Sequence, residues 1–304
     1  MRSRPLLVLL ALALGACAQA PAAPEDAAQG DTVAEAVPVE STALERALRR
    51  VDGPFPDYLE FVDRSDALGR EAPVSGLAHH GRRAPEVLGV DPEAADAVIA
   101  VGRKPRFATL LIGGQDGDAV RARAEASGWA DRDGALRRDL DLLNEPLTVE
   151  AANVRPLGAD VALGGPDAPV ELVDGPGDDL ADDPDVRAMT ACLGDVSAAM
   201  VAGGSLGPLR AVGVRPAPDD DADDDAVATA VLCATGTTAA AVEEAVATGE
   251  SRTGRRPWAQ LLRDPVVEEL GGGVVRLTAR TAPGTPRLLL LAALQQQDLP
   301  GVPA

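Results

Sequence analysis

Aromatic residues are scarce in this sequence, whose 304 residues include three phenylalanines, two tryptophans and one tyrosine. Binding sites that stack sugar rings, nucleobases or quaternary amines depend on aromatic faces. Such ligands are therefore disfavoured for this protein. Hydrophobic residues still make up 46% of the chain, as in globular proteins. A folded core would be built from alanine, valine and leucine.

Positive charge is also in short supply. Lysine and arginine number 28 against 48 aspartates and glutamates, which gives a formal net charge of −20, and Lys104 is the only lysine. Nucleic-acid-binding proteins need clustered cations, whereas the arginines here are scattered among acids. We expect no nucleic-acid partner, and we expect an anionic lipid surface to repel the folded part of the chain.

The N-terminus combines a charged start with a short apolar run. Arg2 and Arg4 precede the run from Leu6 to Leu14, and Gly15-Ala16-Cys17 follows. A membrane-spanning helix needs about 20 apolar residues, so this pattern is typical of a secretory signal peptide instead. Bacterial lipoproteins carry a cysteine directly after small residues of this kind, and its thiol receives a diacylglycerol.

We therefore predict a lipoprotein signal peptide at residues 1–16, lipid attachment at Cys17, and a lipid-anchored protein on the extracytoplasmic face of the cell membrane. The alternative is an ordinary secretory signal cut near Ala16 or Ala18. Residues 17–40 are rich in alanine, proline and acids without apolar periodicity, which predicts a disordered tether after the lipidated cysteine.

Apolar periodicity predicts an α+β domain over residues 41–304, with halves at about 41–175 and 176–304. Helices are expected to start at Thr42, Asp91, Asp118, Asp183, Thr237 and Thr285, and strands are expected at 58–63, 107–112, 147–154, 161–163, 209–214, 226–233 and 274–281. The helix from Asp91 would carry Val98 and Ile99, and the helix from Asp183 would extend to Met200. We expect two β-α-β-type units, with mixed or antiparallel sheets covered by helices.

The two halves of the predicted domain resemble each other. Residues 108–112 followed by Ser127-Gly128 match residues 228–232 followed by Thr248-Gly249 in spacing and in apolar character. An internal duplication would explain this match. The alternative is that alanine-rich strand–helix pairs look alike without common origin.

Cys192 and Cys233 are the two cysteines that remain besides Cys17. In an exported protein such a pair is expected to form a disulfide. The alternatives are two buried thiols or a metal pair, but neither cysteine has a histidine or another cysteine at the spacing of a metal site.

Three runs of the sequence resemble uncharacterised lipoproteins of high-GC Gram-positive bacteria. These runs are Val-Gly-Arg-Lys-Pro-Arg at 101–106, Gly-Gly-Gln-Asp at 113–116, and Asp-Asp-Pro-Asp-Val-Arg-Ala at 182–188 with Cys-Leu-Gly-Asp at 192–195. The resemblance spans most of the mature domain. It implies a lipid anchor and an exported location, and it implies no reaction.

Ser205 lies in a Gly-x-Ser-x-Gly pattern at 203–207, which in hydrolases lifts a serine nucleophile above a sheet. That elbow stands between a strand and a helix, whereas here a predicted helix precedes it and a predicted strand follows. The two histidines, His79 and His80, also precede the serine, although some catalytic triads do have that order. A glycine-rich turn is the better interpretation.

Possible metal ligands are few. Six aspartates occur at 219–225, among them Asp219, Asp221 and Asp223, and calcium accepts carboxylate ligands. The turn glycine and the closing glutamate of a calcium loop are absent, so we expect a solvated loop without a specific metal. His79 and His80 are adjacent, which on a strand would place them on opposite faces.

These observations identify no reaction. The favoured hypothesis is a membrane-anchored exported lipoprotein without catalytic activity, which binds an unknown envelope protein or a small ligand and needs no cofactor. The alternative is a serine hydrolase that uses Ser205 with His79 or His80 and an acid that the sequence does not identify.

Overall fold

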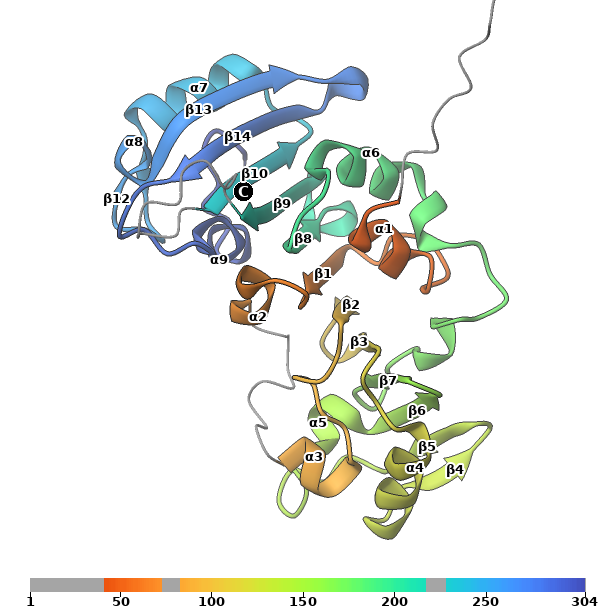
Figure 1. Cartoon of the computed structure of the whole chain (residues 1–304). Coiled ribbons are helices and arrows are strands. Elements are labelled where there is room, and N and C mark those ends of the chain that lie inside the picture. The colour runs from red at the N-terminus through yellow and green to blue at the C-terminus, as the bar shows by residue number, and fades with distance from the viewer. Residues whose placement is uncertain (1–40, 73–82, 217–227, 304) are drawn as a thin grey trace, which may run out of the picture. The chain divides into compact units, whose positions relative to one another are not determined.

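The computed structural model describes residues 41–72, 83–216 and 228–303. They belong to a compact unit that runs from Glu40 to Ala304. Two consecutive halves of this unit each contribute one side of a large β-sheet (Figure 1).

The first half consists, in chain order, of α1 (Ala43–Leu48), β1 (Tyr58–Asp63), α2 (Ala67–Glu71), α3 (Arg83–Leu88), β2 (Ala97–Arg103), β3 (Arg106–Ile112), α4 (Gly117–Ala126), β4 (Ala130–Arg132), β5 (Ala135–Arg137), α5 (Thr148–Ala151), β6 (Asn153–Leu157) and β7 (Asp160–Gly164). Two short 3₁₀ turns, η2 (Val170–Leu172) and η3 (Leu180–Asp182), lead to the second half.

The second half consists of α6 (Pro184–Leu193), β8 (Ala198–Ala202), η4 (Gly204–Leu206), β9 (Arg210–Pro216), β10 (Ala228–Ala234), α7 (Ala239–Thr248), β11 (Glu250–Ser251), β12 (Arg256–Pro257), α8 (Trp258–Leu261), β13 (Leu262–Glu269), η6 (Gly271–Gly273), β14 (Val275–Thr281) and α9 (Leu289–Gln295).

The described residues form a 12-stranded sheet in the order β13-β14-β10-β9-β8-β1-β2-β3-β7-β6-β5-β4, and β11 pairs with β12 in a separate two-stranded sheet. Every neighbouring pair is antiparallel. The fold is therefore mixed α+β with a large antiparallel sheet, as predicted. The two predicted β-α-β units are not shown among these strands.

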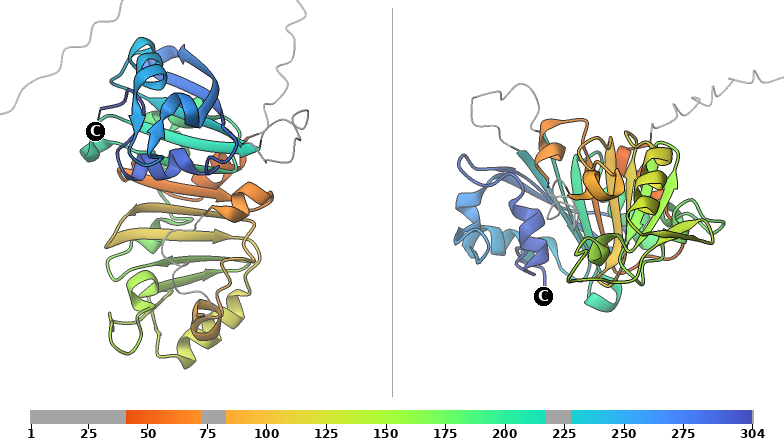
Figure 2. Two further views of the ribbon diagram at one scale, coloured as in Figure 1. Left: turned by 90° about the vertical axis from the view of Figure 1, so that its left-hand side faces the viewer. Right: turned by 90° about the horizontal axis from the view of Figure 1, so that it is seen from below.

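Strands β1 and β8 pair near the middle of the sheet (Figure 2). In this pair Glu60 lies opposite Met200. From this pair outwards the order is β1-β2-β3-β7-β6 in the first half and β8-β9-β10-β14-β13 in the second. In both halves the first three strands follow one another outwards from the central pair, and the last strand of the half comes next, before the one that precedes it in the chain.

Among the described residues, three apolar clusters cover the two faces of the sheet. One face packs against α1 and α6, through residues such as Leu44 and Met189. The opposite face carries two separate clusters, one with α3, α4 and α5 over the first half and one with α7, α8 and α9 over the second. The helices on this face therefore flank the central strands.

Residues 97–103 form strand β2, which corrects the helix predicted from Asp91. The apolar residues that suggested a helical stripe face opposite sides of the sheet, since Val98 packs in the cluster of α3 and α4 while Ile99 packs in that of α1. A strand covered on both faces can be apolar on both sides, so its sequence imitates a helix. Lys104 and Pro105 form the turn between β2 and β3.

The helix predicted from Asp183 is shorter than expected. Asp183 is its N-cap and accepts hydrogen bonds from the backbone of Asp185 and Val186, as the sequence indicates, but α6 ends at Leu193. Gly194 follows with a φ of 67°, a conformation that glycine adopts with little cost. Met200, expected in this helix, lies in β8 instead.

Other boundaries also differ from the predictions. Half of the strand predicted at 147–154 is helix α5, and β6 starts only at Asn153. The last helix begins at Leu289 rather than Thr285. Strands β9, β10 and β14 and helix α7 are found where the sequence predicts them.

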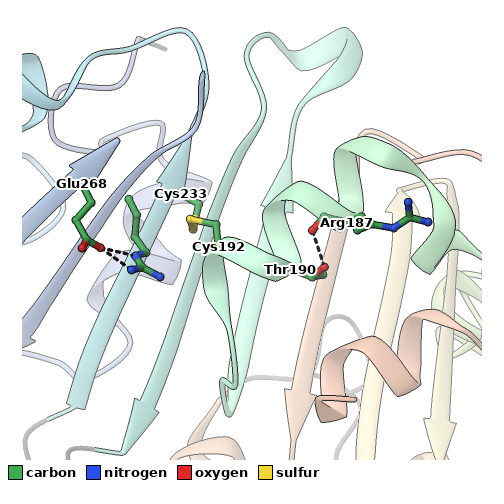
Figure 3. The surroundings of a disulfide bond; sticks show 6 residues. Arg187, Thr190, Cys192, Cys233 and Glu268 are labelled. Carbon is green, nitrogen blue, oxygen red and sulfur yellow. Dashed lines mark hydrogen bonds and ion pairs between the residues drawn. A yellow bond between two sulfur atoms is a disulfide. The ribbon is translucent and has the colours of Figure 1, made fainter. Parts of the chain in front are cut away.

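The predicted disulfide between Cys192 and Cys233 is confirmed (Figure 3). Their Cα atoms are 6.2 Å apart, a normal separation for a disulfide. Cys192 lies on α6 and Cys233 on β10, and both side chains are buried in the same apolar cluster. The disulfide therefore links a covering helix to the sheet of the second half.

Candidate ligand cavity

A cavity of about 510 Å³ opens over the central strands, on the face that carries α9. Three small residues form its floor: Ala100 and Gly102 on β2, and Ala202 on β8. Ala100 lies opposite Glu60, and Ala202 lies opposite Tyr58. Because these floor side chains are short, space remains between the sheet and the flanking helices.

Gly102 cannot be replaced by a larger residue without local change. Its φ is 84°, and a Cβ atom at this position would lie 2.3 Å from the backbone oxygen of Arg106. The β2–β3 hairpin therefore needs glycine here. Because this glycine has no side chain, it also leaves the space above it open to the cavity.

The walls of the cavity come from both halves of the sequence. Helix α9, which packs on β8 and β9, contributes Leu294 and Gln295. The β2–β3 hairpin contributes Arg103, Lys104 and Phe107 from the other side. The cavity therefore exists only when the two halves of the sheet are joined.

Glu60 is a buried carboxylate within this cavity, with 7% of its surface exposed. The hydroxyl of Tyr58 donates a hydrogen bond of 2.6 Å to its Oε1 atom. Burial, together with the negative charge of Glu60, raises the pKa of Tyr58 well above its usual range, so the phenol remains a hydrogen-bond donor. No described cation forms an ion pair with Glu60, although Arg103 also lines the cavity and its charge acts on the Tyr58 hydroxyl.

Arg210 is a buried cation in the same cavity, with 3% of its surface exposed. Its Nη1 and Nη2 atoms donate to the backbone oxygens of Pro303 and Leu206, each at 3.0 Å. Its Nε atom has no hydrogen-bond partner in the part of the chain that the structure describes. No described carboxylate forms an ion pair with this guanidinium.

Lys104 differs from Arg210 because its charge is compensated. Its ammonium group pairs with Glu150, which is buried on α5. The same ammonium lies 5.7 Å from the centre of the Phe107 ring. Lys104 therefore shapes the mouth of the cavity while its charge is already engaged.

Ser205 lies on the exposed turn η4, next to the cavity residue Leu206. Its hydroxyl donates to Asp57, and its backbone N–H donates to the other oxygen of the same carboxylate at 3.0 Å. These hydrogen bonds lower the pKa of Asp57. The histidines of the hydrolase hypothesis, His79 and His80, lie outside the described residues, so that hypothesis stays a prediction.

Other predicted site residues also lie outside the described ranges. They are Cys17 and the three aspartates Asp219, Asp221 and Asp223. Within the described ranges, no group of three or more histidine, cysteine, aspartate or glutamate side chains is placed to hold a metal ion. No helix in those ranges has the length and apolar character needed to cross a membrane.

Sequence reasoning did not identify Glu60 and Arg210 as site residues. A weak signal existed for Glu60, because it alternates with Leu59 and Phe61 in a predicted strand and so faces away from them. Nothing local marks Arg210, which lines the same cavity as Glu60 only because β8 pairs with both β1 and β9.

Comparisons of the chain with protein-family models, with curated proteins and with solved structures found no match. The resemblance to uncharacterised lipoproteins therefore stays a prediction from the sequence.

Proposed function

We propose that this protein is a membrane-tethered binding protein that holds a small polar ligand in the cavity over β1, β2 and β8. The observation that carries the proposal is a cavity of about 510 Å³ lined by two buried charged residues, Glu60 and Arg210. Ligand sites are typically hollows of about 300–1,000 Å³ with a few convergent polar groups in a mainly apolar lining. This cavity has that size, and its lining is more polar than is typical, because Arg103, Lys104, Gln295 and Gln297 line it together with Glu60 and Arg210.

The proposal gives Ser205 a structural role instead of a catalytic one. An activated serine donates its proton to a base, usually an imidazole. Here the hydroxyl donates to Asp57, whose lowered pKa makes it a weaker base than an ordinary carboxylate. The two hydrogen bonds from Ser205 hold the turn η4 against the residue that precedes β1.

The membrane tether is the second part of the proposal. It rests on the signal-peptide pattern before Cys17 and on the composition of residues 17–40. A diacylglycerol on Cys17 would keep the binding domain at the extracytoplasmic face of the membrane without a spanning helix. A ligand from the cell envelope, or an envelope protein that delivers one, is the partner that fits this location.

We also infer that the domain arose by internal duplication. The same order of strands on either side of the β1–β8 pair supports this inference. Helices α4 and α7 support it as well, because each follows the third strand of its half. Each also has an N-cap side chain that accepts a hydrogen bond from the backbone N–H three residues later: Asp116 accepts from Ala119, and Thr238 accepts from Ala241. A cavity at the junction of two repeats would then be a feature that neither repeat has alone.

Filling the cavity tests the proposed function. The Ala202→Leu variant adds a larger side chain to the floor, and Val266→Leu, at an exposed position on the edge strand β13, is the matched control. Each detergent-solubilised protein is dialysed against a metabolite extract of the producing cells, and retained compounds are measured by mass spectrometry. We expect the wild type and Val266→Leu to retain compounds that Ala202→Leu loses. Equal retention by all three proteins, or retention by none, would contradict the proposal.

A further inference from the structure

We propose that the ligand of this cavity carries a positive and a negative charge at separate ends, and that it is a short peptide with free termini. This inference rests on the proposed function, since it names the ligand class of the same site. Its amino terminus would lie against Glu60 and its carboxylate against Arg210.

The positive end follows from the environment of Glu60. Moving a carboxylate from water into a protein is costly unless a cation or several hydrogen bonds compensate it. In the described part of the chain, Glu60 receives a single hydrogen bond, from the neutral hydroxyl of Tyr58. A protonated amine in the cavity would supply both the missing charge and further donors, whereas a hydroxyl group would supply donors alone.

The negative end follows from Arg210. A guanidinium has five N–H donors in a planar fork, and it binds carboxylates with two parallel hydrogen bonds. The two hydrogen bonds of Arg210 go to neutral backbone oxygens, so further N–H donors remain, and no carboxylate in the described part of the chain compensates its charge. An anionic ligand group would complete this arrangement.

The described arginines fall into two groups: some form ion pairs with carboxylates, whereas Arg210, like Arg123 and Arg155, donates to backbone oxygens. Arg50 pairs with Asp174, and Arg83 pairs with Glu145. With 48 acidic residues against 28 basic ones, carboxylates are the commoner partners in this protein. Arg210 is buried, lines the cavity and has no carboxylate partner among the described residues. This arrangement is consistent with a site that receives its anion from a ligand.

The separation of Glu60 and Arg210 along the sheet leaves room for a ligand longer than a free amino acid. Glu60 and Arg210 project from the same face of the sheet, two strands and two residues apart, as the register of β1, β8 and β9 shows. A strand spacing of about 4.8 Å and a rise of about 3.4 Å per residue place their Cα atoms about 12 Å apart. No salt bridge joins their side chains. The two side chains cover part of this separation, and an extended peptide spans at most about 3.6 Å per residue, so a peptide of two or three residues would fit between the charged groups.

The test uses three pools of mixed-sequence tripeptides, with free termini, with an acetylated amino terminus, or with an amidated carboxyl terminus. The detergent-solubilised full-length protein is dialysed against each pool, and retained peptide is quantified by mass spectrometry. We expect the pool with free termini to be retained at least tenfold more strongly than either blocked pool. This comparison uses the wild-type protein and so does not depend on the folding of a variant.

Two variants then assign each charge. Glu60→Gln keeps the size of the side chain and its hydrogen bond to Tyr58, so it should lose the discrimination against acetylated peptides alone. Arg210→Gln should lose the discrimination against amidated peptides alone. Glu268→Gln, on the exposed edge strand β13, is the matched control and should keep both preferences.

Equal retention of the three pools, or retention of none of them, overturns the peptide inference. The proposed function is judged separately, because a metabolite that the wild type retains and Ala202→Leu loses would leave it standing. Unchanged discrimination in Glu60→Gln and Arg210→Gln would also overturn the assignment of the two ends.

Discussion

At the scale of single residues, Tyr58 donates a hydrogen bond to Glu60, a buried carboxylate in the cavity. Glu60 is buried on the central strand, and the Tyr58 hydroxyl is its hydrogen-bond donor. The raised pKa of Tyr58 keeps that hydroxyl protonated through the neutral and moderately alkaline range. The pair therefore positions a carboxylate in the cavity while reducing the cost of burying it.

We predict that Tyr58→Phe destabilises the protein by about 1–3 kcal/mol, because Glu60 loses its donor while it stays buried. The free energy of unfolding is measured with urea. In a Glu60→Leu background the same substitution should have a much smaller effect, since no carboxylate then needs the hydroxyl. Equal effects in both backgrounds would show that the hydrogen bond is not the source of the loss.

Asp174 makes stability depend on pH. Arg50 donates to it through Nε and Nη2, the latter at 2.6 Å, and these hydrogen bonds hold the pKa of Asp174 below its ordinary value of 3.8. A carboxyl group with a lowered pKa in the folded protein stabilises the fold above the ordinary pKa, and this contribution is lost as the pH falls through the lowered value.

We therefore predict that Asp174→Asn lowers the Tm near neutral pH and that its difference from the wild type shrinks towards about pH 2. Asparagine tolerates the positive φ of this position, 48°, so backbone strain should not contribute. The measurement is a series of thermal melts from neutral to acidic pH. Asp167→Asn, at an exposed position, is the control, and a pH-independent difference for Asp174→Asn would refute the prediction.

At the scale of elements, the disulfide joins α6 to the sheet. Cys192 and Cys233 are 41 positions apart in the sequence, and β8 and β9 lie between them. Closing a loop of this kind restricts the unfolded chain more than the folded one. The disulfide therefore stabilises the half of the sheet that carries Arg210.

We predict that the double variant Cys192→Ser, Cys233→Ser loses about 2–4 kcal/mol of unfolding free energy. Chemical denaturation of the variant and of the wild type in reducing agent should give similar losses, because both lack the same bond. A wild type that keeps its full stability after verified reduction would show that the disulfide adds little.

At the scale of the whole molecule, the decisive question is attachment to the membrane. We predict that Cys17→Ser releases the protein from the membrane or blocks its processing, since a serine hydroxyl cannot form the thioether that carries the diacylglycerol. Detergent phase partitioning of wild type and variant measures this directly. If the variant still partitions with the membrane like the wild type, the lipid anchor is wrong.

Several features of this protein could be predicted from the sequence because they depend on neighbouring residues. Helix starts are an example: Thr42 and Glu45 form a capping box, and Asp183 and Thr238 accept hydrogen bonds from the next turn of the backbone. These contacts span three residues at most, so a local pattern is enough to reveal them. The disulfide was predictable for a different reason, because only two cysteines remain besides Cys17.

The tertiary structure alone decided which faces are buried and which residues meet. Residues 97–103 form a strand because apolar clusters cover both sides of β2, and no local pattern distinguishes that situation from a buried helix. Glu60 and Arg210 share a cavity because β8 pairs with β1 on one side and with β9 on the other. Strand pairing over such sequence distances depends on the packing of the whole sheet, and so the composition of the cavity became visible only in the folded chain.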